Sequence, residues 1–95
     1  MYITNTAQNR IEVLSLQTGT LRAPIQVGSQ PIGFDMTPDG TTLYVANSGD
    51  STISVVDLTQ RVELRKITVP SGFSNDSPYS IAIASNGLAL FSTTL

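Results

Sequence analysis

The feature that most constrains this chain of 95 residues is a sequence that repeats itself. A shift of 42 positions aligns residues 2–27 with residues 44–69. The matched pairs are Tyr2 with Tyr44, Asn5 with Asn47, Ile11 with Ile53, Val13 with Val55, Ile25 with Ile67, and Val27 with Val69. A shift of 47 then aligns Pro31 with Pro78 and Gly40 with Gly87, because the connection at 70–77 is longer than the one at 28–30. A period of this length predicts a supersecondary unit whose copies pack against each other.

Each copy is predicted to contain four short strands. Apolar and polar residues alternate with a period of two, and Gly, Pro, Asn, Asp and Ser separate the alternating runs. No window of the sequence carries an apolar stripe at helical spacing, so the expected class is all-β. The expected strands are 1–5, 10–16, 23–27, 31–36, 42–46, 52–57, 63–69, 78–84 and 88–93.

Four strands in about 42 residues is typical of one blade of a β-propeller, a four-stranded antiparallel sheet. With the strands named A to D from the axis outward, the chain reads B-C-D, A-B-C-D, A-B. Strand A of the central copy carries the apolar residues Ile32 and Phe34, as expected near the axis. Strand D carries Glu63, Arg65 and Lys66, and charges of this kind keep an exposed edge from pairing with other chains.

The strand order predicts an incomplete ring within residues 1–95. Residues 1–30 are expected to form a blade that lacks its inner strand, 31–69 a complete blade, and 78–95 the first two strands of a third. A closed propeller needs about four to eight blades. The expected partners are therefore the remaining blades of a longer chain or further copies of this one, and the duplicated strand B favours a fragment of a longer propeller.

A family resemblance rests on residues 37–58, TPDGTTLYVANSGDSTISVVDL. They resemble the YVTN-type β-propeller repeat, which has a Pro-Asp-Gly turn, a Tyr-Val-Thr/Ala-Asn strand end and an Ile/Val-Ser-Val-Ile/Val-Asp strand. Residues 2–16 are a weaker copy, and residues 78–94 a partial one in which Asn86 replaces Asp39 and Thr94 replaces Asn47. The resemblance implies a bacterial or archaeal protein that is secreted, periplasmic or on the cell surface. The chain has no signal peptide or transmembrane segment of its own, so the sequence alone leaves the compartment open.

The composition excludes several kinds of chemistry. The chain has no His and no Cys, which removes every Ser-His-Asp arrangement, thiolate nucleophiles and the usual zinc ligands. We therefore expect no catalytic residue, no metal site and no cofactor. The net charge is −2 and the five basic residues form no stripe, so nucleic acid is not an expected partner. The longest apolar run has a few residues, which predicts no membrane insertion.

The candidate binding residues lie in loops at one end of the predicted blades. The strongest candidate is the long connection 70–78, with Phe73, Ser74, Asn75 and Asp76, because the repeat departs from its own length there and rigid scaffolds carry binding residues on loops. The D-to-A and B-to-C loops of a propeller share one rim. This adds four candidates to the same site, namely Gln8, Asn9, Asn47 and Asp50.

Each candidate also has a structural interpretation. Loop 70–78 is also readable as a tolerated surface insertion, and Asn5 and Asn47 as residues that tie down the following turn. Asp39 with Gly40 is interpreted as a hairpin turn. Asp35 is either a carboxylate satisfied by nearby backbone or a functional acid.

The sequence favours a non-catalytic structural or binding module that presents polar loops to a protein or carbohydrate partner. The alternative is a fragment of a propeller enzyme, lactonase-like or similar to a cofactor-dependent dehydrogenase, whose active site lies mostly outside this chain.

Overall fold

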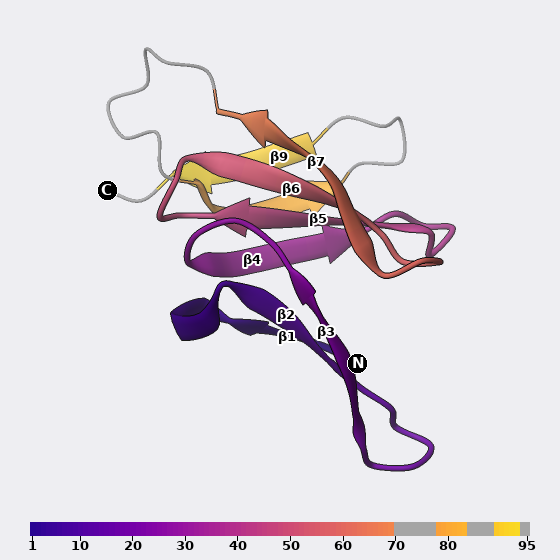
Figure 1. Ribbon diagram of the computed structural model, residues 1–95. Helices are drawn as coiled ribbons and strands as arrows, with labels where there is room; N and C mark the ends of the chain where they lie inside the picture. The colour runs from indigo at the N-terminus through magenta and orange to yellow at the C-terminus, as the bar shows by residue number, and fades with distance from the viewer. Residues whose placement is uncertain (70–77, 84–88, 94–95) are drawn as a thin grey trace.

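The computed structural model describes residues 1–69, 78–83 and 89–93, and these form an all-β structure (Figure 1). The strands are β1 (Tyr2–Asn5), β2 (Arg10–Leu14), β3 (Leu21–Gln26), β4 (Pro31–Met36), β5 (Thr42–Asn47), β6 (Thr52–Asp57), β7 (Val62–Thr68), β8 (Pro78–Ile83) and β9 (Ala89–Thr93). One 3-10 turn, η1 (Thr6–Gln8), follows β1. Within the described segments, no helix has the length and apolar character that a membrane crossing requires.

The strands form three antiparallel sheets in chain order, with orders β1-β2-β3, β4-β5-β6-β7 and β8-β9. Figure 1 shows the sheets stacked one on the next along the sequence. The predicted strand order B-C-D, A-B-C-D, A-B is confirmed. The middle sheet has the four strands of a complete blade, and β5 pairs with β6 along its whole length, from Thr42 opposite Asp57 to Asn47 opposite Thr52.

Several strand boundaries differ from the prediction. The strand expected to reach residue 16 ends at Leu14, and the next begins at Leu21 rather than residue 23. The reason is a turn: the Ser15 N–H donates to the Thr20 carbonyl, and the Gly19 N–H donates to the Ser15 carbonyl. Gly19 has φ of 70°, which L-residues rarely adopt. Apolar spacing cannot locate such a turn, because Leu16 follows Leu14 at the spacing of a strand although it is exposed.

The turn between β4 and β5 follows the prediction. The Gly40 N–H donates to the Thr37 carbonyl over 2.9 Å, and Gly40 has φ of 75°. Asp39 Oδ1 accepts hydrogen bonds from the hydroxyl group of Thr37 at 2.7 Å and from both the amide and the hydroxyl group of Thr41. These bonds lower the pKa of the Asp39 carboxyl, that from Thr37 most. The interpretation of Asp39 and Gly40 as a hairpin turn is confirmed.

The core of the described residues has two layers, one on each face of the middle sheet. One layer lies between the first and middle sheets and contains Ile11, Val13, Ile25, Leu43, Val45, Val56 and Leu58. The other lies between the middle sheet and β8 and contains Ala46, Ile53, Val69 and Ile81. Because both faces of the middle sheet are covered, Ile53 to Val56 is a run of four buried residues. Burial of each large aliphatic side chain contributes about 1.5–3 kcal/mol, so both layers stabilise the stacking of the sheets.

Candidate binding rim

The turns after strands β1 and β5 meet the connection from β3 to β4 at one end of the sheets. We call this surface, residues 6–9, 28–30 and 48–51, the rim; it lies on the left of Figure 1. Backbone hydrogen bonds join its three segments. The Ser48 N–H donates to the Gln30 carbonyl at 3.0 Å, and the Gly49 N–H donates to the Ser29 carbonyl at 2.9 Å. The Val27 N–H donates to the Asn9 carbonyl at 3.1 Å.

Two of the predicted site residues, Asn9 and Asp50, hold the connection from β3 to β4 between them. Asn9 Oδ1 accepts a hydrogen bond from the Gln30 N–H at 2.9 Å. Asp50 Oδ2 accepts one from the Ser29 N–H, also at 2.9 Å. Both side chains are nevertheless exposed, as are Gln8 and Gln30. The structure therefore brings Gln8, Asn9 and Asp50 onto one surface. The other candidates, Phe73, Ser74, Asn75 and Asp76, lie outside the described residues.

Asn47 lies beneath the rim rather than on it. It has no exposed area, and its Nδ2 donates to Thr52 Oγ1 at 3.0 Å and to Ser54 Oγ at 2.8 Å. The two hydroxyl groups give their own protons to Asp50 and Glu63, so they can only accept from Asn47. This fixes the amide orientation and leaves Asn47 Oδ1 buried without a partner in the described structure. Asn47 thus supports the rim from within, and its buried side chain is not available to a ligand.

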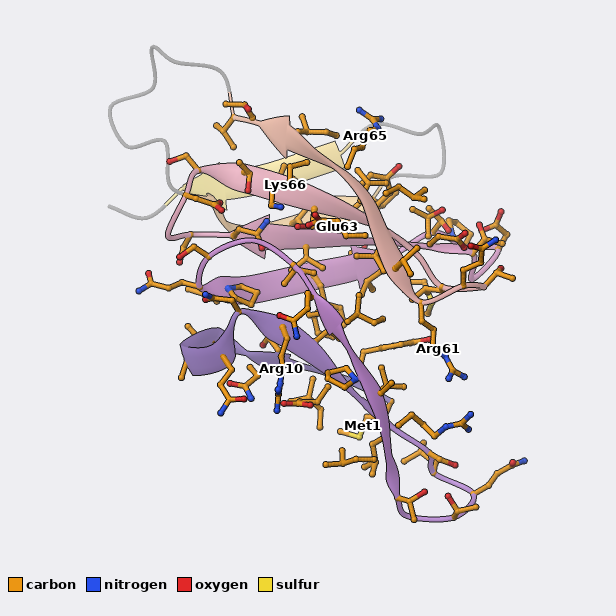
Figure 2. All side chains as sticks on the ribbon, in the orientation of Figure 1. Met1, Arg10, Arg61, Glu63, Arg65 and Lys66 are labelled. Carbon is orange, nitrogen blue, oxygen red and sulfur yellow. The ribbon has the colours of Figure 1, made fainter. Side chains whose placement is uncertain are left out.

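The polar network continues from Asn47 to the outer strand. Ser54 Oγ, which is fully buried, also accepts from the Gly28 N–H at 3.2 Å, and Glu63 on β7 forms an ion pair with Lys66 at 2.8 Å. Figure 2 shows Glu63 and Lys66 close together on the face of β7, with Arg65 apart from them. A chain of hydrogen bonds therefore links the outermost strand to the connection between two blades.

Gly28 lies in the connection 28–30, and its role in this network was not predicted from the sequence. A Cβ atom at Gly28 would lie 2.5 Å from Asn47 Nδ2 and 2.8 Å from Asp50 Oδ2, so any other residue there would displace these side chains. The signal in the sequence was a glycine at the start of the connection between β3 and β4. Its meaning depends on Asn47 and Asp50, which come about twenty residues later and from the neighbouring sheet.

In the first sheet, Asn5 has the place that Asn47 has in the second. Asn5 Oδ1 accepts from the Gln8 N–H at 3.2 Å and so caps η1, and Asn5 Nδ2 donates to Glu12 Oε2 at 2.7 Å. Arg10 Nε also donates to Glu12 Oε2, at 2.8 Å. The bond from Asn5 and then that from Arg10 lower the pKa of the Glu12 carboxyl. Both strand-end asparagines therefore tie down the following turn, which supports their structural interpretation.

Backbone strain concentrates on the rim. In the described part of the chain, four residues other than glycine have positive φ: Asn9 (59°), Gln30 (53°), Ser51 (59°) and Arg61 (57°). The first three belong to the rim, and Arg61 lies at the other end of the sheets (Figure 2). Such conformations are uncommon in non-glycine residues and persist where surrounding contacts enforce them, often at functional sites.

Asp35 joins two neighbouring inner strands. Its Oδ2 accepts a hydrogen bond from the Ile83 N–H of β8 at 2.7 Å, and its Oδ1 accepts from the Met36 N–H at 2.9 Å. The interpretation of Asp35 as a carboxylate satisfied by nearby backbone is thus supported. Among the residues that the structure describes, no three His, Cys, Asp or Glu side chains gather as metal ligands would.

The sheets and their connections define the class of protein: these are blades of a β-propeller, each an antiparallel sheet that packs face to face on the next. The chain is similar to hydrazine synthase from Kuenenia stuttgartiensis, with a TM-score of 0.86 and 29% identity over 97% of this chain and 25% of that one. It is also similar in fold to a functionally unknown protein from Desulfotomaculum acetoxidans, with a TM-score of 0.74 and 20% identity over 97% of this chain and 30% of that one. The chain thus spans less than a third of either structure. No family model matches the sequence, and no curated protein is detectably similar to it.

Proposed function

We propose that this chain is a non-catalytic structural and binding module of a YVTN-type repeat propeller, which presents its polar rim to a protein or carbohydrate partner. The observation that carries the proposal is the rim itself. Its three segments are held together by hydrogen bonds, and it still exposes the side chains of Gln8, Asn9, Gln30 and Asp50.

The chemistry of the exposed groups suits recognition by hydrogen bonds. Three of the four side chains are carboxamides, each with donors and an acceptor, and Asp50 adds a carboxylate. Because the connection 28–30 is already fixed by Asn9 and Asp50, little conformational entropy would be lost on binding. The left-handed conformations at Asn9, Gln30 and Ser51 also support a binding role for the rim, since strained backbone conformations cluster at functional sites.

Two further parts of the proposal concern the rest of the molecule. The remaining blades belong to a longer chain, which the small shares of the two similar structures support, since this chain spans 25% and 30% of them. The compartment is outside the cytoplasm, secreted, periplasmic or at the cell surface, and rests on the resemblance of residues 37–58 to YVTN-type repeats.

A second candidate function is that of a propeller within an enzyme whose active site lies mostly in other blades. The specific observation in its favour is the likeness to hydrazine synthase, at 29% identity over nearly the whole chain. The coding sequence on either side separates the two functions. Further blades with His or clustered carboxylates on their inner strands would favour the enzyme.

The binding proposal is tested by titrating the isotope-labelled chain with maltohexaose, chitohexaose and a panel of synthetic peptides, with amide chemical shifts as the readout. We expect shifts at residues 6–9, 28–30 and 48–51 and none at the turn 37–41. Gln8→Ala should weaken binding about tenfold, as loss of one central contact typically does. Gln60→Ala is the matched control, because Gln60 is an exposed glutamine in the turn at the opposite end. Shifts confined to residues 37–41 and 58–61, or equal effects of the two variants, would contradict the proposal.

A further inference from the structure

The outer strands of the first and middle sheets gather most of the basic residues of the chain. Strand β3 carries Arg22, strand β7 carries Arg65 and Lys66, and Arg61 comes directly before β7 (Figure 2). The two strands contact each other although they belong to different sheets. We call the surface made of β3, Arg61 and β7 the outer surface. Four of the five basic residues therefore meet on two neighbouring strands, although they come from different copies of the repeat.

The charge of the outer surface is opposite to that of the remaining chain. The outer surface has four basic residues and one acidic residue, Glu63, so its net charge is +3. The remainder has one basic residue and six acidic residues, which gives −5, and the two values add up to the net charge of −2. A positive surface on an acidic protein favours a partner whose negative charge is local, because an extended polyanion would also meet the acidic remainder.

The three arginines of the outer surface are available to a ligand. Lys66 forms an ion pair with Glu63 at 2.8 Å, and this pair uses the one carboxylate of the surface. Within the described part of the chain, the side chains of Arg22, Arg61 and Arg65 form no ion pair or hydrogen bond, and all three are exposed. A guanidinium group binds a carboxylate through two parallel hydrogen bonds. The three arginines therefore fit an acidic ligand.

The backbone of β7 places an apolar side chain among these charges. The register of β6 and β7 shifts between Glu63 and Arg65, so Leu64 is an extra residue with no partner on β6. A β-bulge of this kind re-aims a side chain, and Leu64 is 61% exposed. Arg61 has φ of 57°, which is uncommon for an arginine. Protection of a sheet edge accounts for the charges on β7, but it does not account for an exposed leucine between two of them.

We propose that the outer surface is a docking site for an acidic segment of another protein, in which two carboxylates flank an aliphatic residue. Arg61 and Arg65 are separated by roughly 13 Å along an extended chain, and Leu64 lies between them. An extended segment with carboxylates at the same spacing bridges the two arginines and places its central side chain beside Leu64. The charges and the bulge of β7 disfavour strand addition, so side chains carry the recognition. This site lies on other residues than the rim and does not depend on the binding role of the rim.

A protein segment fits the outer surface better than nucleic acid or an anionic membrane does. Both of these present negative charge over a wide area, so they would also approach exposed carboxylates such as Asp39 and Asp50 at the two ends of the sheets. Proteins that bind single-stranded nucleic acid stack bases on aromatic side chains, and β3 and β7 contain none. Arginine is enriched at protein–protein interfaces, where apolar side chains form the centre of the contact.

An NMR titration of the isotope-labelled chain tests the site with a synthetic probe. The probe is a peptide with blocked ends in which two glutamates flank a central leucine, with one alanine on each side of the leucine. We expect amide shifts at residues 22–24 and 61–68 and none at the rim. Raising NaCl from about 50 to about 500 mM should weaken binding about tenfold, because salt screens exposed charges. No shift at residues 61–68 with about 5 mM peptide, or binding that salt does not weaken, would overturn the proposal.

Arginine variants provide matched controls. Arg61→Gln and Arg65→Gln should each weaken binding of the probe about two- to fivefold, the effect expected of one exposed charge pair. Arg10→Gln removes the one basic residue outside the outer surface, which pairs with Glu12 at 2.8 Å, and should leave binding unchanged. Leu64→Ser should also weaken binding, since it removes the apolar contact but no charge. An equal loss in Arg10→Gln would show that net charge alone matters, and would overturn the site.

Other occupants of the outer surface give different results. The same titration is repeated with a single-stranded oligonucleotide, with vesicles that contain phosphatidylserine, and with the chain alone at increasing concentration. Tighter binding of the oligonucleotide or the vesicles at residues 61–68 would assign the surface to an extended polyanion. Concentration-dependent shifts at these residues without any probe would identify a second copy of the chain as the occupant. Each of these results would overturn the assignment to an acidic protein segment.

Discussion

The side-chain amide of Asn47 donates to the hydroxyl group of Ser54 over 2.8 Å, and neither residue has any exposed area. Ser54 in turn accepts from the Gly28 N–H and donates to Glu63, so this buried pair links the outer strand β7 with the connection between the first two sheets. Buried polar groups of this kind stabilise a fold only when they are paired, and removing one partner is costly.

The first prediction concerns the buried asparagine. Asn47→Ala removes two hydrogen bonds from the interior, and we expect the free energy of unfolding to fall by about 1–3 kcal/mol. Asn5→Ala is the matched control at the same position of the other repeat. It should cost less, about 0.5–1 kcal/mol, because water can reach the partly exposed partners that Asn5 leaves behind. Urea denaturation followed by circular dichroism measures the free energy of unfolding of both variants. Equal losses would show that the buried hydrogen bonds of Asn47 stabilise the chain no more than the partly exposed bonds of Asn5.

The second prediction concerns the space at Gly28. Gly28→Ala places a Cβ atom against Asn47 and Asp50, which must move apart, and we expect a loss of about 1–3 kcal/mol. The displaced Asp50 should also release the Ser29 N–H, whose amide exchange should speed up. Gly40→Ala is the control, since nothing lies within 4 Å of its Cβ position and its cost comes from φ of 75° alone. Gly40→Ala should leave amide exchange at Ser29 unchanged. Faster exchange at Ser29 in Gly40→Ala as well would refute a steric origin of the effect in Gly28→Ala.

The third prediction concerns strain at Gln30. Glycine adopts φ of 53° without the penalty that L-residues carry, so Gln30→Gly should stabilise the chain by up to about 1 kcal/mol. Gln26→Gly replaces the same amino acid at an exposed position of β3 and should destabilise by about 0.5–1 kcal/mol. Thermal unfolding of the two variants shows directly whether each substitution raises or lowers the stability of the chain. A destabilising Gln30→Gly would mean that the glutamine side chain stabilises the rim by more than its backbone strain costs.

The fourth prediction concerns acid. The pKa of Glu12 is lowered chiefly by its bond from Asn5, and that of Asp39 chiefly by its bond from Thr37. A carboxyl whose pKa is lower in the folded chain contributes stability above its unfolded pKa and loses that contribution as pH falls through its folded pKa. Stability should therefore decline below about pH 4. In Glu12→Gln and Asp39→Asn this decline of stability with falling pH should be shallower. Urea midpoints across the acid range measure it. If stability declined as steeply in the double variant as in the unmodified chain, these two carboxyl groups would not be the source of the decline.

Much of the fold could be predicted because its signals are local. The alternation in residues 52–57 and the turn at Pro38–Gly40 depend on neighbours a few residues apart, and the repeat supplied the same elements again in the first and third copies. The turn after Asn5 was predicted, but the alternation did not show that it takes the form of the 3-10 turn η1, which Asn5 caps. Asn47 was predicted at the rim, where its strand ends, but the sequence did not show that Thr52 and Ser54 would draw its side chain inward.

The sequence by itself determined which residues become strands, where most turns lie and that the unit repeats, because side-chain alternation and turn geometry act within a few residues. Only the tertiary structure decided which distant partners the polar residues of the rim and Asp35 bind. Asn9 meets Gln30 and Asp50 meets Ser29 at the connection between the first two sheets, and Asp35 meets Ile83 across the middle and third sheets. Those contacts depend on the stacking of sheets across two hydrophobic layers, a relation between residues about 20 to nearly 50 positions apart that no local pattern encodes.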